Sequence, residues 1–131
     1  MKLPENKPLF FDFWATWCTP CVAAFGFNRD LDTFLINKNI ERVYVSFDGI
    51  YSYAKWREAI NKYALGGYHI LANDSLKDDI KHIIYHEKGK NDPMGIPRYV
   101  LVNKGKVVID DAISPTELDL LKKQIVEVLN L

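Results

Sequence analysis

The sequence contains little cysteine, no excess of charge and no long hydrophobic run. Its only two cysteines, Cys18 and Cys21, lie three residues apart, so they cannot build the disulfide framework of a small secreted fold. A total of 17 Lys and Arg residues balances 17 Asp and Glu residues, and this zero net charge disfavours nucleic-acid binding. No apolar run approaches the ~20 residues that span a bilayer, and residues 1–5 lack the apolar stretch of a signal peptide.

The length and composition fit one globular domain. The chain has 131 residues, of which 48% are hydrophobic and 26% are charged. That composition supports a hydrophobic core and argues against disorder. Because no internal repeat, linker or low-complexity tract is present, we expect a single domain over residues 1–131.

Hydrophobic patterns predict alternating strands and helices. Near-continuous apolar runs predict buried strands, and apolar stripes at helical spacing predict helices. The expected strands cover residues 8–15, 42–47, 68–72, 98–102 and 106–109, and the expected helices carry stripes over residues 27–35, 53–63, 76–84 and 118–128. Ser75 and Ser114 are the expected N-caps of the last two helices, and residues 89–95 are an expected loop. The predicted fold class is a three-layer α/β/α sandwich with a mixed central sheet, a C-terminal β-hairpin and a final helix.

The motif Cys18-Thr19-Pro20-Cys21 lies where a buried strand gives way to a helix. Unpaired backbone N–H groups at a helix start stabilise a thiolate. Pro20 suits the first helical turn, where its missing N–H would have had no partner. We expect Cys18 to be exposed and reactive, and Cys21 to be shielded one turn later with its sulfur close enough to bond. This arrangement fits thiol–disulfide exchange, in which Cys18 attacks and Cys21 resolves the mixed disulfide.

A metal site and inert packing are the alternatives for the cysteine pair. A C-x-x-C motif can form half of a zinc site, but zinc needs four ligands. No second cysteine pair exists, and the three histidines, His69, His82 and His86, are scattered along the chain. We therefore expect redox chemistry and no metal.

Two segments resemble the thioredoxin superfamily. Residues 11–21, Phe-Asp-Phe-Trp-Ala-Thr-Trp-Cys-Thr-Pro-Cys, look like its active-site signature, and residues 95–107, which begin Gly-Ile-Pro-Arg-Tyr, look like its cis-proline strand and closing hairpin. Residues 44–48, the helix around Trp56 and residues 63–65 are most similar to the TlpA/ResA-like branch. The resemblance covers roughly residues 8–130, and its two motifs in the right order are more specific than a lone C-x-x-C.

The resemblance implies catalytic roles for three residues and a place for Pro97 beside them. Cys18 matches the family's nucleophile, and Cys21 matches its resolving cysteine. Asp12, six residues before Cys18, matches a buried carboxylate. Burial would raise the pKa of such a carboxylate and let it exchange a proton with Cys21. Pro97 matches the cis-proline that faces the two sulfurs.

The resemblance also implies a substrate-binding surface. Ile96, before the cis-proline, would offer its backbone to an extended substrate strand. Trp17 would flank the reactive sulfur and supply contact area. The expected substrate-binding residues are Trp17, Thr19, Pro20, Ile96 and Pro97.

The chain departs from the family at three positions. Gly26 stands where many relatives have a helix-kinking proline, and Ala24 stands where the ResA-like branch often has a glutamate. Tyr44 falls where thioredoxin has a lysine close to the buried carboxylate. Each change alters the surroundings of the cysteine pair. The usual leading strands are reduced ahead of Pro8, so the C-terminal domain of a longer protein is a second interpretation of the chain.

The function implied by the resemblance is an enzyme, a thiol–disulfide oxidoreductase that reduces protein disulfides. The cysteine pair itself would be the redox group, with no further cofactor. The implied partners are protein disulfide or dithiol substrates and a membrane or thioredoxin-type electron donor. The implied location is the periplasm or cell envelope, where the protein would serve redox homeostasis, and the cytoplasm is the alternative because no signal peptide is visible.

Two other functions share this expected fold. A thiol peroxidase of the AhpC/TSA kind needs a Pro-x-x-x-Thr/Ser-x-x-Cys pattern, which precedes neither cysteine. A redox-inactive binding module would leave the cysteine pair idle. The intact pair, together with Asp12 and Pro97, argues against that second alternative.

Overall fold

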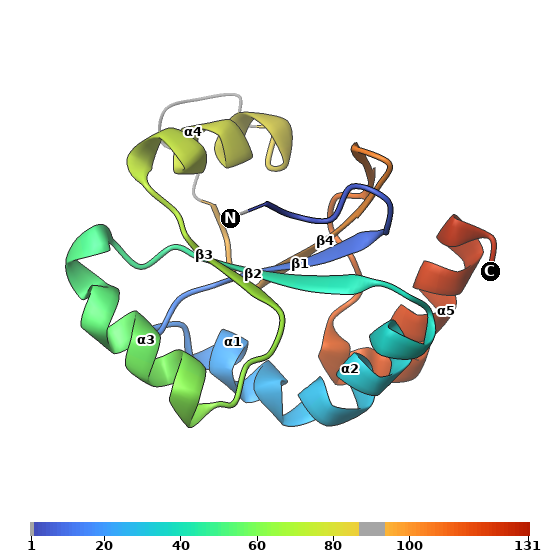
Figure 1. Cartoon of the computed structure of the whole chain (residues 1–131), viewed down its shortest axis with the longest axis horizontal. Helices are drawn as coiled ribbons and strands as arrows, with labels where there is room; N and C mark the ends of the chain where they lie inside the picture. The colour runs from blue at the N-terminus through green and yellow to red at the C-terminus, as the bar shows by residue number, and fades with distance from the viewer. Residues whose placement is uncertain (1, 87–93) are drawn as a thin grey trace.

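The computed structural model describes residues 2–86 and 94–131, and its centre is a five-stranded mixed sheet (Figure 1). The strand order is β3-β2-β1-β4-β5. The strands are β1 (Leu9–Trp14), β2 (Glu41–Ser46), β3 (Tyr68–Leu71), β4 (Arg98–Asn103) and β5 (Lys106–Ile109). The five predicted strands are therefore confirmed, with ends that differ by at most one residue.

Strand directions follow the predicted pattern. The central strand β1 pairs in parallel with β2 and in antiparallel fashion with β4. Beyond them, β3 is parallel to β2, and β5 forms the closing hairpin with β4. Because β1 is covered on both faces, its near-continuous apolar sequence is typical of a central strand.

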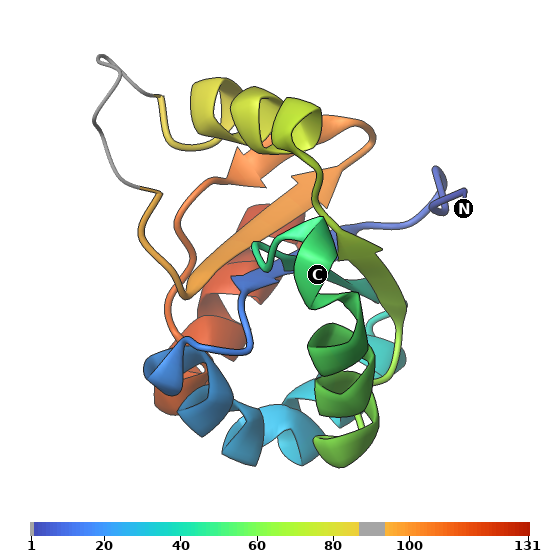
Figure 2. The ribbon, with the colours of Figure 1, turned by 90° about the vertical axis from the view of Figure 1, so that its left-hand side faces the viewer.

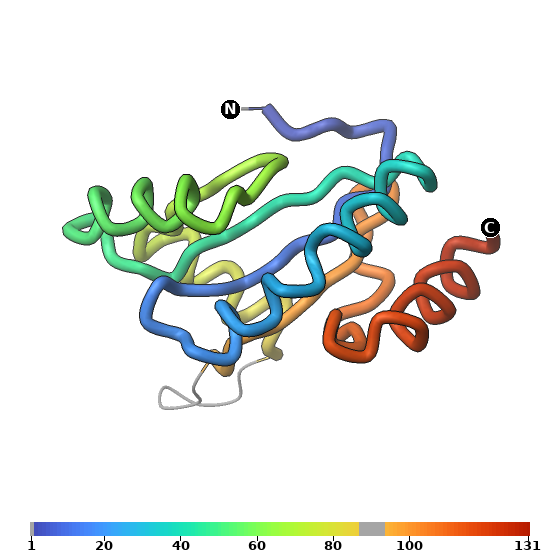
Figure 3. The backbone as a smooth tube through the Cα atoms, turned by 90° about the horizontal axis from the view of Figure 1, so that it is seen from below, coloured from blue at the N-terminus to red at the C-terminus, as the bar shows by residue number. Residues whose placement is uncertain are grey.

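Helices lie on both faces of the sheet, but unequally. They are α1 (Thr19–Ala24), α2 (Asn28–Asn37), α3 (Tyr53–Lys62), α4 (Asp74–Ile83) and α5 (Leu118–Leu129). Four of them, α1, α2, α3 and α5, cover one face (Figure 3), and α4 alone covers the other (Figure 2). This confirms the predicted α/β/α layers. None of the described helices has the length and apolar character to cross a membrane.

The helix starts differ in detail from the predictions. A 3-10 turn over Phe25–Phe27 separates α1 from α2, so Gly26 lies at the break between the two helices. The N-cap of α4 is Asn73, whose side chain accepts a hydrogen bond from the Leu76 N–H at 2.8 Å, so the prediction of Ser75 was wrong. Ser114 caps a 3-10 turn that leads into α5. Of the expected loop 89–95, residues 89–93 lie outside the described residues.

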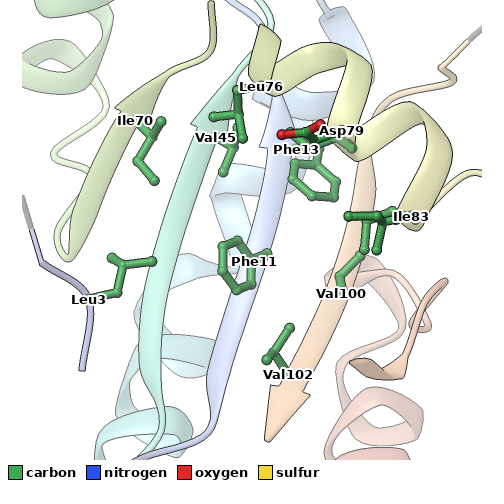
Figure 4. A pocket seen from close by; sticks show the side chains of 12 residues that line it. Leu3, Phe11, Phe13, Val45, Ile70, Leu76, Asp79, Ile83, Val100 and Val102 are labelled. Carbon is green, nitrogen blue, oxygen red and sulfur yellow. The ribbon is translucent and has the colours of Figure 1, made fainter. Parts of the chain in front are cut away.

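Alternate residues of β1 point to opposite faces of the sheet. Phe11 and Phe13 face α4 and line a cavity of about 360 Å³ beneath it (Figure 4). Phe10 packs in the core formed with α2 and α5, and the Trp14 ring meets the Phe25 ring edge-on. Asp12 lies between Phe10 and Trp14 in sequence, so the pleat directs it towards the face with four helices.

Gly67 has a strict backbone requirement next to β2. Its φ is +91°, and a Cβ on it would lie 2.5 Å from the carbonyl oxygen of Arg42. We expect Gly67→Ala to lower the free energy of unfolding by more than about 1 kcal/mol, measured by chemical denaturation. Gly26→Ala is the matched control, because a Cβ added at Gly26 would meet nothing within 4 Å. That control should be neutral or stabilising, and equal losses in both variants would contradict the expectation.

Candidate active site

The candidate active site begins where β1 ends. Cys18 and Cys21 form a disulfide, with a Cα–Cα distance of 5.3 Å. Cys18 is the N-cap residue of α1, and its Sγ accepts a hydrogen bond from the Cys21 N–H at 3.3 Å. Its own N–H donates to the Ala15 carbonyl at 3.1 Å, which closes the turn between strand and helix. The structure thus places the sulfur of Cys18 against a backbone donor at a helix start, where negative charge is stabilised.

The two cysteines are less exposed than expected. Cys18 is 5% exposed and Cys21 is 1% exposed, so the prediction of an exposed Cys18 is wrong for the disulfide-bonded form. Cys21 is the more shielded of the two, as expected. Trp17, directly before Cys18, is 67% exposed, and Thr19 and Pro20 are also exposed. The residues around Cys18 therefore form the accessible part of the site.

Asp12 is a buried carboxylate on the strand that leads into the site. It is 2% exposed, and its Oδ2 accepts a hydrogen bond from Arg42 at 2.9 Å. Burial raises the pKa of Asp12 from 3.8 to about 6, although the charge of Arg42 acts in the opposite direction. Asp12 Oδ1 has no hydrogen-bond partner within the described part of the chain. Asp12 can therefore gain or lose a proton near neutral pH.

Arg42 is a functional residue that the sequence analysis missed. It follows the start of β2 and is itself buried. Besides Asp12, its guanidinium binds Asp32 at 2.8 Å and Asn28 at 2.9 Å, both on α2. Its Cζ also lies 4.6 Å from the centre of the Tyr44 ring. Arg42 therefore supplies a cation beside the buried carboxylate, where thioredoxin has a lysine and this chain has a tyrosine at position 44.

A pairing argument would have found Arg42. Tyr44 is the register partner of Asp12 in the parallel pair β1–β2, and Arg42 is two residues earlier on the same face. An arginine inside an otherwise apolar strand needs a buried partner of opposite charge. Burial raises the pKa of Tyr44, so its hydroxyl stays protonated and accepts a hydrogen bond from Asn28 at 3.1 Å. Arg42 therefore provides the positive charge beside Asp12, and the Tyr44 ring packs against the Arg42 guanidinium.

Ile96 and Pro97 lie at the same edge of the sheet as the cysteine turn. Their peptide bond is cis, and both residues are half-buried. Arg98, the first residue of β4, is the register partner of Phe13 near the end of β1. The hydroxyl of Tyr85 donates a hydrogen bond to the Gly95 carbonyl at 2.7 Å, which holds the residue directly before Ile96 in place. The fold therefore brings the two sequence motifs, which are far apart in the chain, to one edge of the sheet.

Comparison with known proteins agrees with this geometry. The sequence profile described as thioredoxin-like matches residues 6–108. The thiol-disulfide oxidoreductase ResA of Oceanobacillus iheyensis is 44% identical over 45 residues, which are 34% of this chain and only 23% of ResA.

Solved structures share the whole fold. The thioredoxin domain of a thiol-disulfide oxidoreductase from Bacteroides vulgatus superposes with a TM-score of 0.72 at 22% identity, over 94% of this chain and 79% of that one. StoA of Bacillus subtilis superposes with a TM-score of 0.63 at 19% identity, over 96% and 84% of the two chains. At such identities the likeness shows the fold alone. Since the profile match covers most of the chain, the protein belongs to the thioredoxin-like family.

Proposed function

We propose that this protein is a thiol–disulfide oxidoreductase that reduces protein disulfides through Cys18 and Cys21. The observation that carries the proposal is the disulfide itself, which joins the N-cap residue of α1 to a residue one turn later. A disulfide at that position ends a reaction cycle in which Cys18 is the attacking thiolate. The family membership and the buried Asp12 on the preceding strand support it.

The reaction proceeds by two exchanges. The Cys18 thiolate attacks one sulfur of the substrate disulfide, so that a Cys18–substrate bond forms, the substrate bond breaks and the leaving sulfur takes up a proton. The Cys21 thiol then loses its proton and attacks Cys18 Sγ. The Cys18–Cys21 bond forms, and the second substrate sulfur leaves as a thiolate. Two electrons pass from the dithiol to the substrate in this sequence.

Asp12 is the proposed base for the second exchange. Its pKa of about 6 makes the carboxylate available at neutral pH, and its Oδ1, which has no hydrogen-bond partner among residues 2–86 and 94–131, is the proposed acceptor of the Cys21 proton. Arg42 holds the other oxygen and opposes a further rise of the pKa. The ion pair thereby keeps Asp12 in the ionised form that a base requires.

The exposed residues around Cys18 form the proposed substrate surface. Trp17, Thr19 and Pro20 supply it on one side, and Ile96 and Pro97 supply it on the other. Trp17 offers a large apolar contact at little cost in side-chain entropy. In this proposal, the backbone of Ile96 pairs with an extended substrate strand.

The cellular setting is also part of the proposal. The cysteine pair acts as the only redox group, with no metal or further cofactor. A membrane or thioredoxin-type electron donor returns it to the dithiol after each cycle. The proposed location is the periplasm or cell envelope, as the resemblance to the TlpA/ResA-like branch implies, and the partial match to ResA supports that resemblance.

Cys21→Ser provides the direct test. We expect this variant to accumulate a mixed disulfide between Cys18 and the substrate, because the second exchange cannot occur. The complex is measured on non-reducing gels and by mass spectrometry with a disulfide-containing protein such as insulin. The double variant Cys18→Ser/Cys21→Ser is the control and should form no complex. If the single variant can be alkylated at Cys18 but traps no substrate, the proposed activity is wrong.

A further inference from the structure

A second buried carboxylate, Asp48, lies close to the cysteine turn and has no place in the steps above. Asp48 follows the end of β2 and is 2% exposed. It forms no ion pair among residues 2–86 and 94–131. A buried charge without a counter-ion needs hydrogen bonds to offset its loss of water. Its partners therefore indicate what the carboxylate does.

The hydrogen bonds of Asp48 lead to the turn before Cys18. Its Oδ2 accepts from the Thr16 N–H at 2.9 Å, and its Oδ1 accepts from the Thr16 hydroxyl at 2.6 Å. The Ser46 hydroxyl donates to Oδ2 at 2.6 Å and accepts from the Asp48 N–H at 3.0 Å. Hydrogen bonds to an ionised carboxylate are about twice as strong as neutral ones. Asp48 therefore binds Thr16 by two strong bonds and is itself fixed by Ser46.

Thr16 is two residues from the sulfur that the mechanism uses. It lies inside the turn closed by the Cys18 N–H and the Ala15 carbonyl. Just before that turn, the Phe47 N–H donates to the Trp14 carbonyl at 2.7 Å, which ties the same stretch of chain to β2 again. Hydrogen bonds thus connect the turn to the end of β2 at two points, at Trp14 just before the turn and at Thr16 within it.

We propose that Asp48 is a positioning residue for Cys18, acting through its two hydrogen bonds to Thr16. The inference rests on the proposed thiol–disulfide exchange. With the turn held, Cys18 Sγ stays against the Cys21 N–H, where the thiolate is stabilised. With the turn released, the sulfur loses that donor for part of the time. Both the fraction of thiolate and the alignment for attack then fall.

Three neutral substitutions test this without changing any charge. Thr16→Val removes the hydroxyl that donates to Asp48, Thr16→Ser keeps it, and Ser46→Ala removes the support on the other side. The first readout is the pH profile of Cys18 alkylation by iodoacetamide in the reduced protein, which needs no substrate. The second is the rate of insulin reduction, and the third is the free energy of unfolding.

We expect Thr16→Val to move the alkylation profile to higher pH and to slow insulin reduction by about 10-fold. Ser46→Ala should change the alkylation profile and the rate of insulin reduction in the same direction but by less, because the hydrogen bonds between Thr16 and Asp48 remain. If Thr16→Val does not fold, Ser46→Ala serves as the test. Thr16→Ser should stay within about 2-fold of the wild type. Folded variants with reduced stability but an unchanged alkylation profile would overturn the proposal, because Asp48 would then be structural only. A wild-type protein that fails to reduce insulin would overturn the proposed function, whereas the alkylation profiles would still decide the role of Asp48.

Discussion

Cys18→Ser is expected to reduce the rate of protein disulfide reduction to the uncatalysed rate. A serine hydroxyl is not ionised at neutral pH, so the variant lacks the nucleophile of the first exchange. The measurement is the reduction of insulin by the protein with dithiothreitol as the final electron donor. Cys21→Ser is the matched control, since it removes the other sulfur of the same disulfide and retains the first attack.

The outcome separates the two cysteines. If Cys18→Ser turns over insulin and Cys21→Ser forms no mixed disulfide, the roles assigned to the two residues are reversed. If both variants match the wild type, the disulfide has no part in turnover. The larger loss of turnover is expected for Cys18→Ser. Cys18 is the N-cap residue of α1, and its Sγ accepts a hydrogen bond from the Cys21 N–H.

Asp12→Asn is expected to slow the second exchange by about 100-fold at pH 7 and to leave the first attack unchanged. The side chain keeps its shape but loses the ability to take the proton of Cys21. Stopped-flow measurement of mixed-disulfide formation and decay separates the two steps. In the wild type the decay rate should rise with pH through about 6, the pKa of Asp12, and the variant should lack this rise. Equal slowing of both steps would remove Asp12 from the proton transfer.

The Asp12 carboxyl also makes stability depend on pH. Its pKa is raised in the folded state, so the folded protein holds the proton more tightly than the unfolded chain does. Stability is therefore greatest below about pH 4 for this group and falls as pH rises through about 6. The expected loss, relative to Asp12→Asn, is about 3 kcal/mol of unfolding free energy. Denaturation of both proteins at pH 4 and pH 7 measures it.

Arg42→Met is the companion variant for the stopped-flow measurement of mixed-disulfide formation and decay. Arg42 lowers the pKa of Asp12 against the effect of burial. Its removal should move the pH rise of mixed-disulfide decay above about 6, and it should leave the first attack unchanged. An unshifted profile would show that Arg42 does not influence the proton affinity of Asp12.

The sequence predicts the local parts of this site well. The near-continuous apolar run before Cys18 predicts β1 as a buried strand, and Asp12 lies within that run. The resemblance adds Pro97, which no local pattern would single out. Each of these inferences depends on residues within one segment or on a known motif.

The missing parts depend on contacts between distant segments. Arg42 is 30 residues from Asp12, and Asp48 is 32 residues from Thr16, so both pairs appear only when β2 is placed beside β1. A capping box predicts Ser75 as the N-cap of α4, but the helix is capped two residues earlier, by Asn73. The low exposure of Cys18 likewise depends on how the turn packs once it is tied to β2.

The two faces of the sheet separate the cavity beneath α4 from the buried ion pair of Asp12 and Arg42. Arg42, which binds Asp12, lies on the face with four helices, whereas Phe11 and Phe13 on the same strand line the cavity beneath α4, and the Phe13 ring also stacks on Phe47. Because neighbouring residues of β1 point in opposite directions, substitutions under α4 leave the proton-transfer groups untouched. Side chains that line the cavity can therefore be enlarged or reduced without altering a contact of the Asp12 carboxylate.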